Sequence, residues 1–156
     1  MPAEYAIEMR GITKTFGSVV ANKDVNLTLR QGEILSLLGE NGSGKTTLMN
    51  MLSGIYAPDS GQILVDGKEV TISSPEDSKK LGIGMVHQHF KLVDVFSAAD
   101  NIWMGKEKPG FTLKKDRYEE IGEMARKFGF DIDPKKKVRN MAVSEKQTLE
   151  IIKVLY

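Results

Sequence analysis

A glycine-rich segment at residues 39–47 places the strongest constraint on the fold of this chain. Its sequence is G-E-N-G-S-G-K-T-T, which matches the pattern G-x-x-x-x-G-K-[ST], a loop that follows a strand and opens a helix. Residues 34–38 form a short apolar run typical of a buried strand. Beyond the loop, apolar residues recur with helical spacing at Leu48, Met51, Leu52 and Ile55. The sequence therefore predicts a strand, a tight loop and a helix in direct succession.

The residue types of this segment suit a loop that binds phosphate groups. Its glycines let the backbone curl so that several N–H groups converge, and the N-terminus of the following helix adds partial positive charge. Lys45 would supply a full charge to a triphosphate, and the Thr46 hydroxyl suits Mg²⁺, which takes few protein ligands. A glycine-rich turn that precedes Lys-Thr by chance would not account for the strand and helix patterns on either side. We therefore predict a phosphate-binding P-loop.

Composition limits the remaining classes of function. The 156 residues suffice for one domain with a real core, and the net charge of +1 gives no electrostatic case for nucleic acid or an acidic membrane. The absence of cysteine excludes disulfides and thiolate metal sites. No apolar run approaches the roughly 18–20 residues that span a bilayer, and residues 1–5 lack the pattern of a signal peptide. An ordinary globular protein is expected.

Before and after the P-loop, the patterning predicts two hairpins. A strand from Tyr5 to about Phe16 and an alternating strand at residues 25–29 precede the loop. After the turn Pro58-Asp59-Ser60-Gly61, strands at 62–66 and 68–72 flank Asp66-Gly67, a dipeptide typical of tight turns. A short helix starts at Pro75 with Ser74 as its cap, and residues 83–86 are predicted to form another buried strand.

The second half of the chain is predicted to be helical. Residues 94–103 indicate a loop and then a helix, 104–112 a loop, and an amphipathic helix starts at about Lys115. Lys135-Lys136-Lys137 is interpreted as a solvated turn rather than a phosphate site. Ser144 and Gln147 have the spacing of a capping box, which predicts a helix from Ser144.

Three other positions in the sequence could form sites. His87 and His89 offer two imidazoles without a third ligand, so surface or packing histidines are favoured over a metal site. Asp66 follows an apolar run, as a Mg²⁺ ligand does in P-loop enzymes, but Gly67 and Lys68 come next, and a hairpin turn explains it better. Phe16 is either a core aromatic or a platform on which a base stacks, and both interpretations stay open.

In chain order, these features closely resemble the ATP-binding subunits of ABC transporters. The resemblance rests on Thr13-Lys14-Thr15-Phe16-Gly17, the P-loop, Pro58-Asp59-Ser60-Gly61, Met85-Val86-His87-Gln88-His89-Phe90 and the last helix. Residues 84–93, with Ala99-Asp100-Asn101-Ile102, look like the branch that imports nucleosides and simple sugars. Two ATPase units are usually fused in tandem there, and this chain looks like the first.

The resemblance implies a fold and a set of partners. The expected class is α/β, a P-loop NTPase core of ABC type with an N-terminal antiparallel β subdomain and the start of a helical subdomain. Residues 1–90 would form the β subdomain with the P-loop core, and 91–156 the helical subdomain through the signature helix. The implied partners are ATP, Mg²⁺, membrane-spanning permease subunits and a second ATPase unit, without nucleic acid. The implied location is cytoplasmic, peripheral on the inner face of the cell membrane.

The resemblance also assigns roles to individual residues. Phe16 matches the aromatic that stacks on adenine, and Gln88 matches the Gln-loop residue that senses Mg²⁺ and the γ-phosphate and faces the membrane subunit. Thr46 and Gln88 would hold the metal. The segment that would cradle the phosphates comprises Gly39, Glu40, Asn41, Gly42, Ser43, Gly44, Lys45, Thr46 and Thr47.

Two departures from the family pattern bear on catalysis. The signature L-S-G-G-Q corresponds to residues 141–147, where Ala142 replaces the serine and Ser144 the second glycine. The Walker B strand of the family, with its Mg²⁺ Asp and catalytic Glu, would follow Tyr156, so no catalytic residue is assigned within these 156 residues. We expect nucleotide binding without turnover by this chain, and coupling of hydrolysis to import in the full protein.

The alternatives are a non-transport ABC ATPase and a nucleotide-binding or interaction module without catalysis. The first would carry a long coiled coil or a basic insertion, and neither is found in the sequence. A GTPase is disfavoured because the guanine-reading N-K-x-D motif is absent and two strands precede the P-loop.

Overall fold

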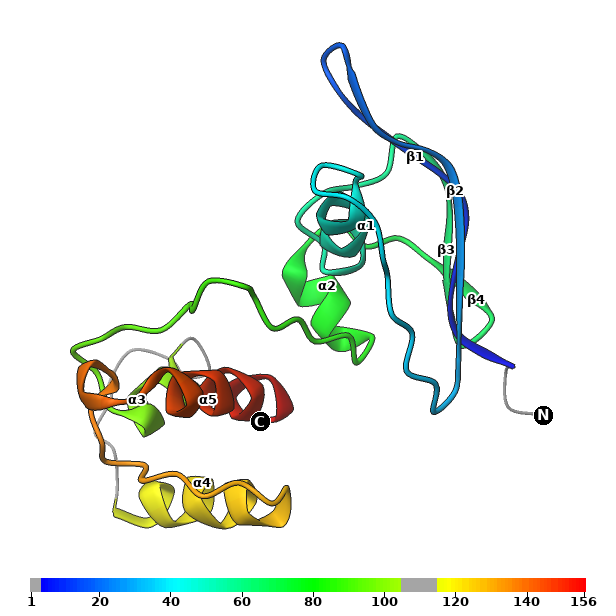
Figure 1. Cartoon of the computed structure of the whole chain (residues 1–156). Helices are drawn as coiled ribbons and strands as arrows, with labels where there is room; N and C mark the ends of the chain where they lie inside the picture. Colours follow the sequence, from blue (N-terminus) through cyan, green and yellow to red (C-terminus); the bar gives the residue numbers. More distant parts are fainter. Residues whose placement is uncertain (1–3, 105–114) are drawn as a thin grey trace. The chain divides into compact units, whose positions relative to one another are not determined.

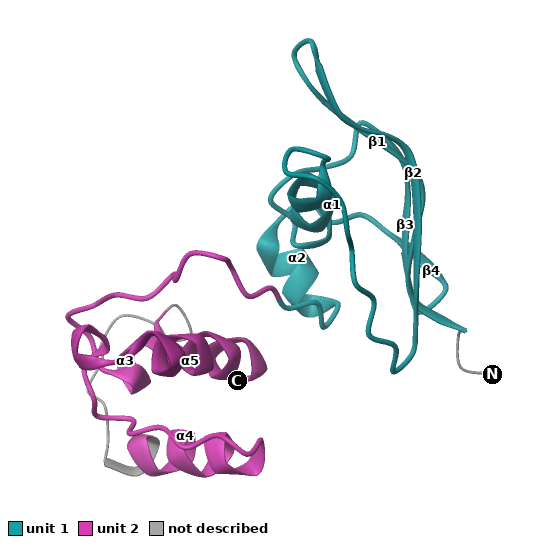
Figure 2. Ribbon diagram, viewed as in Figure 1, with its two compact units in different colours: residues 1–84 teal, residues 85–156 magenta. Residues whose placement is uncertain are grey.

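The computed structural model describes residues 4–104 and 115–156 of the chain. These residues fall into two compact units, Met1–Gly84 and Met85–Tyr156 (Figure 2). The resemblance divides the chain after residue 90 instead, and that division stays a prediction about the domain organisation. Of the loop predicted at 104–112, only Met104 lies within the described residues. None of the described helices has the length and apolar character that crossing a membrane requires.

The first unit is built on a four-stranded antiparallel sheet with the order β2-β1-β3-β4 (Figure 1). Its strands are β1 (Tyr5–Phe16), β2 (Val19–Arg30), β3 (Ser60–Val65) and β4 (Lys68–Val70). Both predicted hairpins are therefore confirmed. Asp66 and Gly67 have φ angles of 50° and 74°, the left-handed backbone that a two-residue hairpin turn needs. Asp66 is thus a turn residue, as the sequence indicated.

The β1–β2 hairpin extends beyond the rest of the sheet. Strand β3 pairs with β1 only between Ile7 and Thr13, whereas the β1–β2 pairing continues to Phe16 and Val19. The outer part is a two-stranded ribbon, and Val19 and Val20 at its tip are exposed. This extension beyond the predicted strand at 25–29 follows from pairing with β1, which short-range alternation does not report.

Two helices complete the first unit, α1 (Lys45–Leu52) and α2 (Pro75–Lys80). Helix α2 begins as predicted, because Ser74 Oγ accepts a hydrogen bond from Asp77 N at 3.2 Å. Helix α1 buries its apolar stripe against the sheet, in a core of Met9, Ile12, Leu48, Met51, Leu52, Ile63 and Ile72. Each fully buried aliphatic side chain contributes about 1.5–3 kcal/mol. Ile55, predicted on the same stripe, lies past the end of the helix and is exposed.

Two predicted strands are absent from the described structure. Residues 34–38 and 83–86 have no strand pairing, and Ile34 and Leu38 are 95% and 90% exposed. Their apolar sequences suit strands of a parallel sheet, which are covered on both faces and hydrogen-bonded on both edges. Neither segment belongs to the described sheet, whose strand pairs are all antiparallel. The prediction was wrong here because a strand requires a partner as well as a pattern.

The second unit is helical. It contains α3 (Ala98–Trp103), α4 (Lys115–Lys127), a short 3₁₀ turn (Val138–Asn140) and α5 (Val143–Leu155). Its own apolar core joins all three α-helices through Ala98, Ala99, Ile102, Ile121, Ala125, Val138, Met141, Leu149 and Ile152. The three predicted helices are confirmed, so the helical spacing of apolar residues in this half reports a real buried face.

The start of α5 differs from the prediction by one residue, which changes its cap. Ala142 is the N-cap, and its backbone N–H donates to the Glu145 carboxylate at 2.7 Å. Ser144 therefore lies inside the first turn and does not cap the helix. Glu145, rather than Gln147, accepts the hydrogen bond from the N-cap N–H. Its carboxylate is anionic and is also held by the Lys136 ammonium at 2.7 Å. Lys136 of the predicted solvated turn is thus tied to α5.

Candidate phosphate-binding site

The loop before α1 is closed by the side chain of Lys45. Its Nζ donates to the backbone oxygens of Gly39 and Glu40, each at 2.7 Å, and to Ser43 Oγ at 3.2 Å. The ammonium group therefore stands at the centre of the loop, ringed by three oxygen atoms. Oxygens of a phosphate chain are acceptors of the same kind and carry more negative charge, so they can replace these partners.

Gly44 fixes the point where the loop becomes a helix. It is the N-cap of α1 with φ = 85°, and a Cβ atom there would lie 2.3 Å from the backbone oxygen of Ala21. Only glycine fits such an approach to β2 in this backbone conformation. The buried Asn22 donates its amide to Gly44 O at 3.4 Å from the same strand. Strand β2 thus sets the position of the helix N-terminus.

The chemistry of the loop suits an anion. The first turn of α1 contains no acidic residue, and the first N–H groups of a helix lack acceptors within it. These N–H groups, the partial positive charge at the helix N-terminus and the Lys45 ammonium form a donor set that fits a triphosphate. Thr46 is exposed at the same turn, where its hydroxyl is free to take part in Mg²⁺ coordination. Residues 40–43 of the predicted cradle are exposed as well.

Phe16 lies at the end of β1 and is outside the core. Its side chain is 42% exposed, so the interpretation as a core aromatic is wrong. Tyr56 meets it edge to face with ring centroids 5.1 Å apart and planes at 71°. Lys14 Nζ lies over the Phe16 ring, 5.6 Å from its centroid. The ring is thus supported by two neighbours and keeps a large free surface.

Asp59 of the turn 58–61 makes contacts near Phe16 that the sequence pattern does not show. Its carboxylate accepts from Lys14 Nζ at 2.8 Å, from Thr15 N at 2.7 Å and from Thr15 Oγ1 at 2.8 Å. The Lys14 and Thr15 hydrogen bonds lower the pKa of Asp59 from 3.8 to about 2. The turn 58–61 was interpreted only as a chain reversal. A carboxylate inside it was the available signal, but its partners are 44 and 45 positions away.

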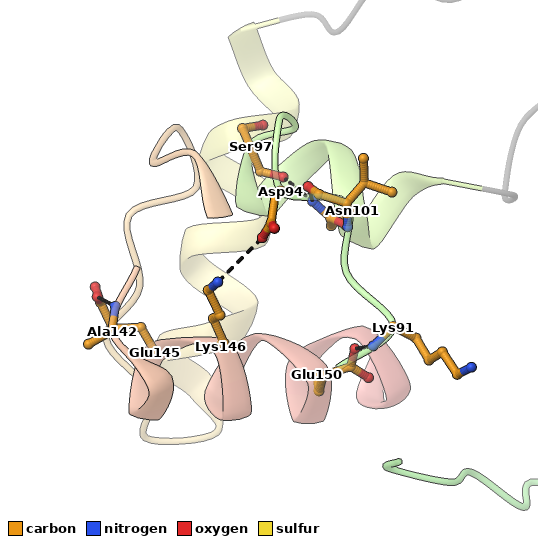
Figure 3. Close-up of polar contacts among 9 residues, drawn as sticks. Lys91, Asp94, Ser97, Asn101, Ala142, Glu145, Lys146 and Glu150 are labelled. Atoms are coloured by element: carbon orange, nitrogen blue, oxygen red, sulfur yellow. Dashed lines mark hydrogen bonds and ion pairs between the residues drawn. The ribbon is translucent and has the colours of Figure 1, made fainter. Parts of the chain in front are cut away.

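Gln88 lies in the second unit, exposed at a bend without regular structure. The chain just after it is held by α5. Glu150, only 3% exposed, accepts from Lys91 N at 2.6 Å, and Lys153 Nζ donates to Lys91 O at 2.9 Å. Lys146 pairs with Asp94 at 3.3 Å (Figure 3). Positions 146, 150 and 153 share one helix face, so α5 anchors residues 91–94.

Asn101 of α3 also binds this segment. Its amide oxygen accepts from Val93 N at 2.7 Å, and its amide nitrogen donates to Val93 O and Ser97 O at 3.1 and 3.0 Å. All of these contacts lie within the second unit. The segment that follows Gln88 is therefore built into a polar network, and the sequence pattern alone did not show it.

The structure also describes the surroundings of the other candidate residues, which are the histidines, Asp66 and the signature segment. Among residues 4–104 and 115–156, no group of three or more His, Asp or Glu side chains could hold a metal ion. Asp66 accepts from Gln31 Nε2 at 2.6 Å, which adds to its role in the hairpin turn. In the degenerate signature, Ala142 and Ser144 are exposed and Met141 is buried in the helical core.

Comparisons with known proteins agree with this arrangement. The profile described as ABC transporter matches residues 22–156. The guanosine import ATP-binding protein NupO of Bacillus subtilis is 48% identical over 98% of this chain and 30% of its own length. The nucleoside import ATP-binding protein NupA of Lactococcus lactis is 47% identical over 100% of this chain and 31% of its own. The chain thus spans less than a third of the length of these relatives.

Solved structures show the same fold. The ADP conformation of MJ1267, an ATP-binding cassette of an ABC transporter, matches with a TM-score of 0.84 at 21% identity, over 97% of this chain and 64% of that one. The structure of cbiO1 from Clostridium perfringens, part of the ABC transporter complex cbiONQ, matches with a TM-score of 0.76 at 26% identity, over 97% and 61%. Together with the P-loop geometry, these matches show that the chain belongs to the ABC transporter family and has the fold of its ATPase domain.

Proposed function

We propose that this chain binds ATP with Mg²⁺ at the P-loop and is the ATP-binding part of an importer of nucleosides or simple sugars. The observation that carries the binding proposal is the Lys45 ammonium, ringed by its own loop oxygens at the N-terminus of α1. The solute class is supported by the relatives named for guanosine and nucleoside import. Phosphate oxygens replace the loop oxygens around Lys45, so the charge is already in place when the ligand arrives.

We assign the remaining roles from the chemical groups that each residue offers. The Thr46 hydroxyl would hold the metal, and the Phe16 ring would stack on the base. The family resemblance assigns Gln88 a role toward the metal as well. Backbone N–H groups of residues 39–47 bind the phosphate oxygens. Mg²⁺ held at Thr46 would neutralise part of the phosphate charge.

The partners are permease subunits and a second ATPase unit, and the site of action is the cytoplasmic face of the membrane. In such an assembly, hydrolysis would drive uptake. The 156 residues contain no match to the Walker B carboxylate or the catalytic Glu. Hydrolysis needs a group that orients or deprotonates the attacking water, and the neutral amide of Gln88 is a poor base. The chain by itself therefore binds ATP without appreciable turnover.

The binding proposal is tested by titrating the purified chain with a fluorescent ATP analogue in the presence of Mg²⁺. Lys45→Ala removes charge-assisted hydrogen bonds of about 1.5–3 kcal/mol, which corresponds to a roughly 10- to 100-fold loss of affinity. Lys79→Ala, an exposed lysine on α2 of the same unit, is the matched control and should bind as the wild type does. Equal affinity of wild type and Lys45→Ala, with both folded by circular dichroism, would refute the phosphate site.

Turnover is measured on the same proteins by phosphate release. We expect wild type and Lys45→Ala to give the same background rate, because each missing catalytic part is worth orders of magnitude in rate. Steady release that disappears in Lys45→Ala would contradict the proposal and would point to a carboxylate of this chain as a metal ligand.

A further inference from the structure

We propose that the turn at residues 58–61 positions the Phe16 ring for the nucleobase, with Asp59 as the central positioning residue. The inference rests on the proposed function, since Phe16 needs positioning only if a base stacks on it. It assigns a task to a motif that otherwise only reverses the chain.

Asp59 binds the three residues that precede Phe16. Its carboxylate accepts from the Lys14 ammonium and from the N–H and hydroxyl of Thr15, all within 2.8 Å. Its backbone N–H donates to Thr13 O at 2.9 Å. One residue therefore fixes both the main chain at the end of β1 and the side chain of Lys14.

Lys14 links Asp59 to the Phe16 ring. The same ammonium that pairs with Asp59 lies over the face of Phe16, 5.6 Å from the centroid. Tyr56, three residues before Asp59, contacts the ring at 5.1 Å. The segment 56–59 thus reaches Phe16 twice, directly through Tyr56 and indirectly through Lys14.

The sheet sets where this turn lies. A Cβ atom on Gly61, which has φ = 100°, would come within 2.6 Å of Gly11 O, so β3 starts in close contact with β1. Strand β3 pairs with β1 only as far as Thr13. Beyond that residue, β2 is the only described strand beside β1, and Asp59 supplies contacts on the side of β3. The contact begins where the strand pairing stops.

Positioning matters because stacking requires a ring in a fixed place. An exposed aromatic at the end of a two-stranded ribbon would lose conformational freedom when it binds a base, and that loss weakens affinity. Holding residues 14 and 15 from outside the hairpin removes part of this loss in advance. The phosphates bind elsewhere, so the effect should depend on the presence of a base.

The test compares ATP with inorganic triphosphate by isothermal titration calorimetry. The proteins are the full 156-residue wild type, Phe16→Ala, Asp59→Ala and the double variant. We expect Phe16→Ala to weaken ATP roughly 5- to 100-fold, and Asp59→Ala to weaken it about 3- to 10-fold as a partial loss of the same stacking. Triphosphate affinity should stay within about twofold in both. In the Phe16→Ala background, Asp59→Ala should have no further effect on ATP, because the residues act through one ring.

Two further variants separate positioning from stability. Asp77→Ala removes another carboxylate of the first unit, one that binds Ser73 N and Ser74 Oγ. It should lower thermal stability without changing the ratio of ATP to triphosphate affinity. Asp59→Asn keeps an acceptor for Thr15 but loses the charge that holds Lys14, and it replaces Asp59→Ala if that variant does not fold.

The inference is overturned if the Asp59 variants weaken ATP and triphosphate equally, or if their effect on ATP persists without the Phe16 ring. Failure of the proposed function itself would look different, because the wild type would then show no triphosphate binding that depends on Lys45.

Discussion

At the scale of single residues, the Asp59 carboxylate predicts a specific response to acid. The Lys14 ammonium, with the Thr15 hydroxyl and N–H, holds the pKa of Asp59 at about 2, against 3.8 ordinarily. A folded-state pKa below the unfolded one stabilises the fold above the unfolded pKa, and this contribution is lost as the pH falls toward the folded value. The relevant window is therefore about pH 4 to pH 2.

We expect the stability difference between wild type and Asp59→Asn to be constant above about pH 5 and to shrink as the pH falls toward 2. Thermal unfolding of both proteins at closely spaced pH values measures it. Asp77 and Glu145 also have lowered pKa values, caused chiefly by hydrogen bonds from Ser74 and Lys136. Their contributions are common to both proteins and cancel in the difference. A difference independent of pH down to 2 would contradict the assigned contacts.

The same residues show what sequence can predict about a site. Lys45 and Gly44 were identifiable because the loop places its chemistry within a few consecutive positions. Phe16 stayed ambiguous, since burial at the end of a strand depends on whether another element covers it. The contacts of Asp59 could not be predicted from the sequence, because its hydrogen bonds to Lys14 and Thr15 depend on the antiparallel register of β1 with β3.

At the scale of elements, the N-terminus of α5 lacks a side-chain cap. Ala142 is the N-cap and has no oxygen to accept from the first-turn N–H groups. Ala142→Ser should therefore stabilise the protein by about 0.5–2 kcal/mol, measured by urea unfolding of the chain. Ser144→Ala is the control, because Ser144 is exposed inside the first turn, and it should change stability by no more than about 0.5 kcal/mol.

The reverse result, a loss in Ser144→Ala and no gain in Ala142→Ser, would place the cap where the sequence pattern put it. The two capping patterns, Ser144 with Gln147 and Ala142 with Glu145, differ by two residues, and local spacing alone cannot choose between them. Lys136 decides the matter by pairing with Glu145, which is a tertiary contact. Helix α2 was predicted correctly because Ser74, Pro75 and Asp77 all act within one turn.

At the scale of the whole molecule, the apolar segment 34–38 is uncovered in the first unit. Ile34, Leu35, Leu37 and Leu38 are all exposed, and the segment has no strand partner among the described residues. Unpaired backbone with apolar side chains pairs readily with another chain. We expect the 156-residue chain to associate with itself as its concentration rises, which sedimentation velocity detects.

Leu38→Lys should weaken this association at least roughly tenfold, because burying one leucine is worth about 1.5–3 kcal/mol. Val20→Lys, at the exposed tip of the hairpin, is the matched control and should leave the association unchanged. A compact monomer at every concentration would show that the segment is covered in solution. The failed strand prediction and this behaviour have one cause, since the pattern specifies a buried strand and the described residues provide no neighbour for it.

The short reach of β3 along β1 has a consequence for how the first unit opens. Amides of β1 from Ile7 to Thr13 lie between two strands, whereas those from Lys14 to Phe16 have only β2 as a partner among the described strands. Local opening free energy should therefore fall along the hairpin, and hydrogen exchange should be fastest toward Val19. The ring proposed to meet the base stands next to this tip, at the last paired residue of β1. Bound nucleotide would slow exchange there by suppressing a motion, without building any new secondary structure.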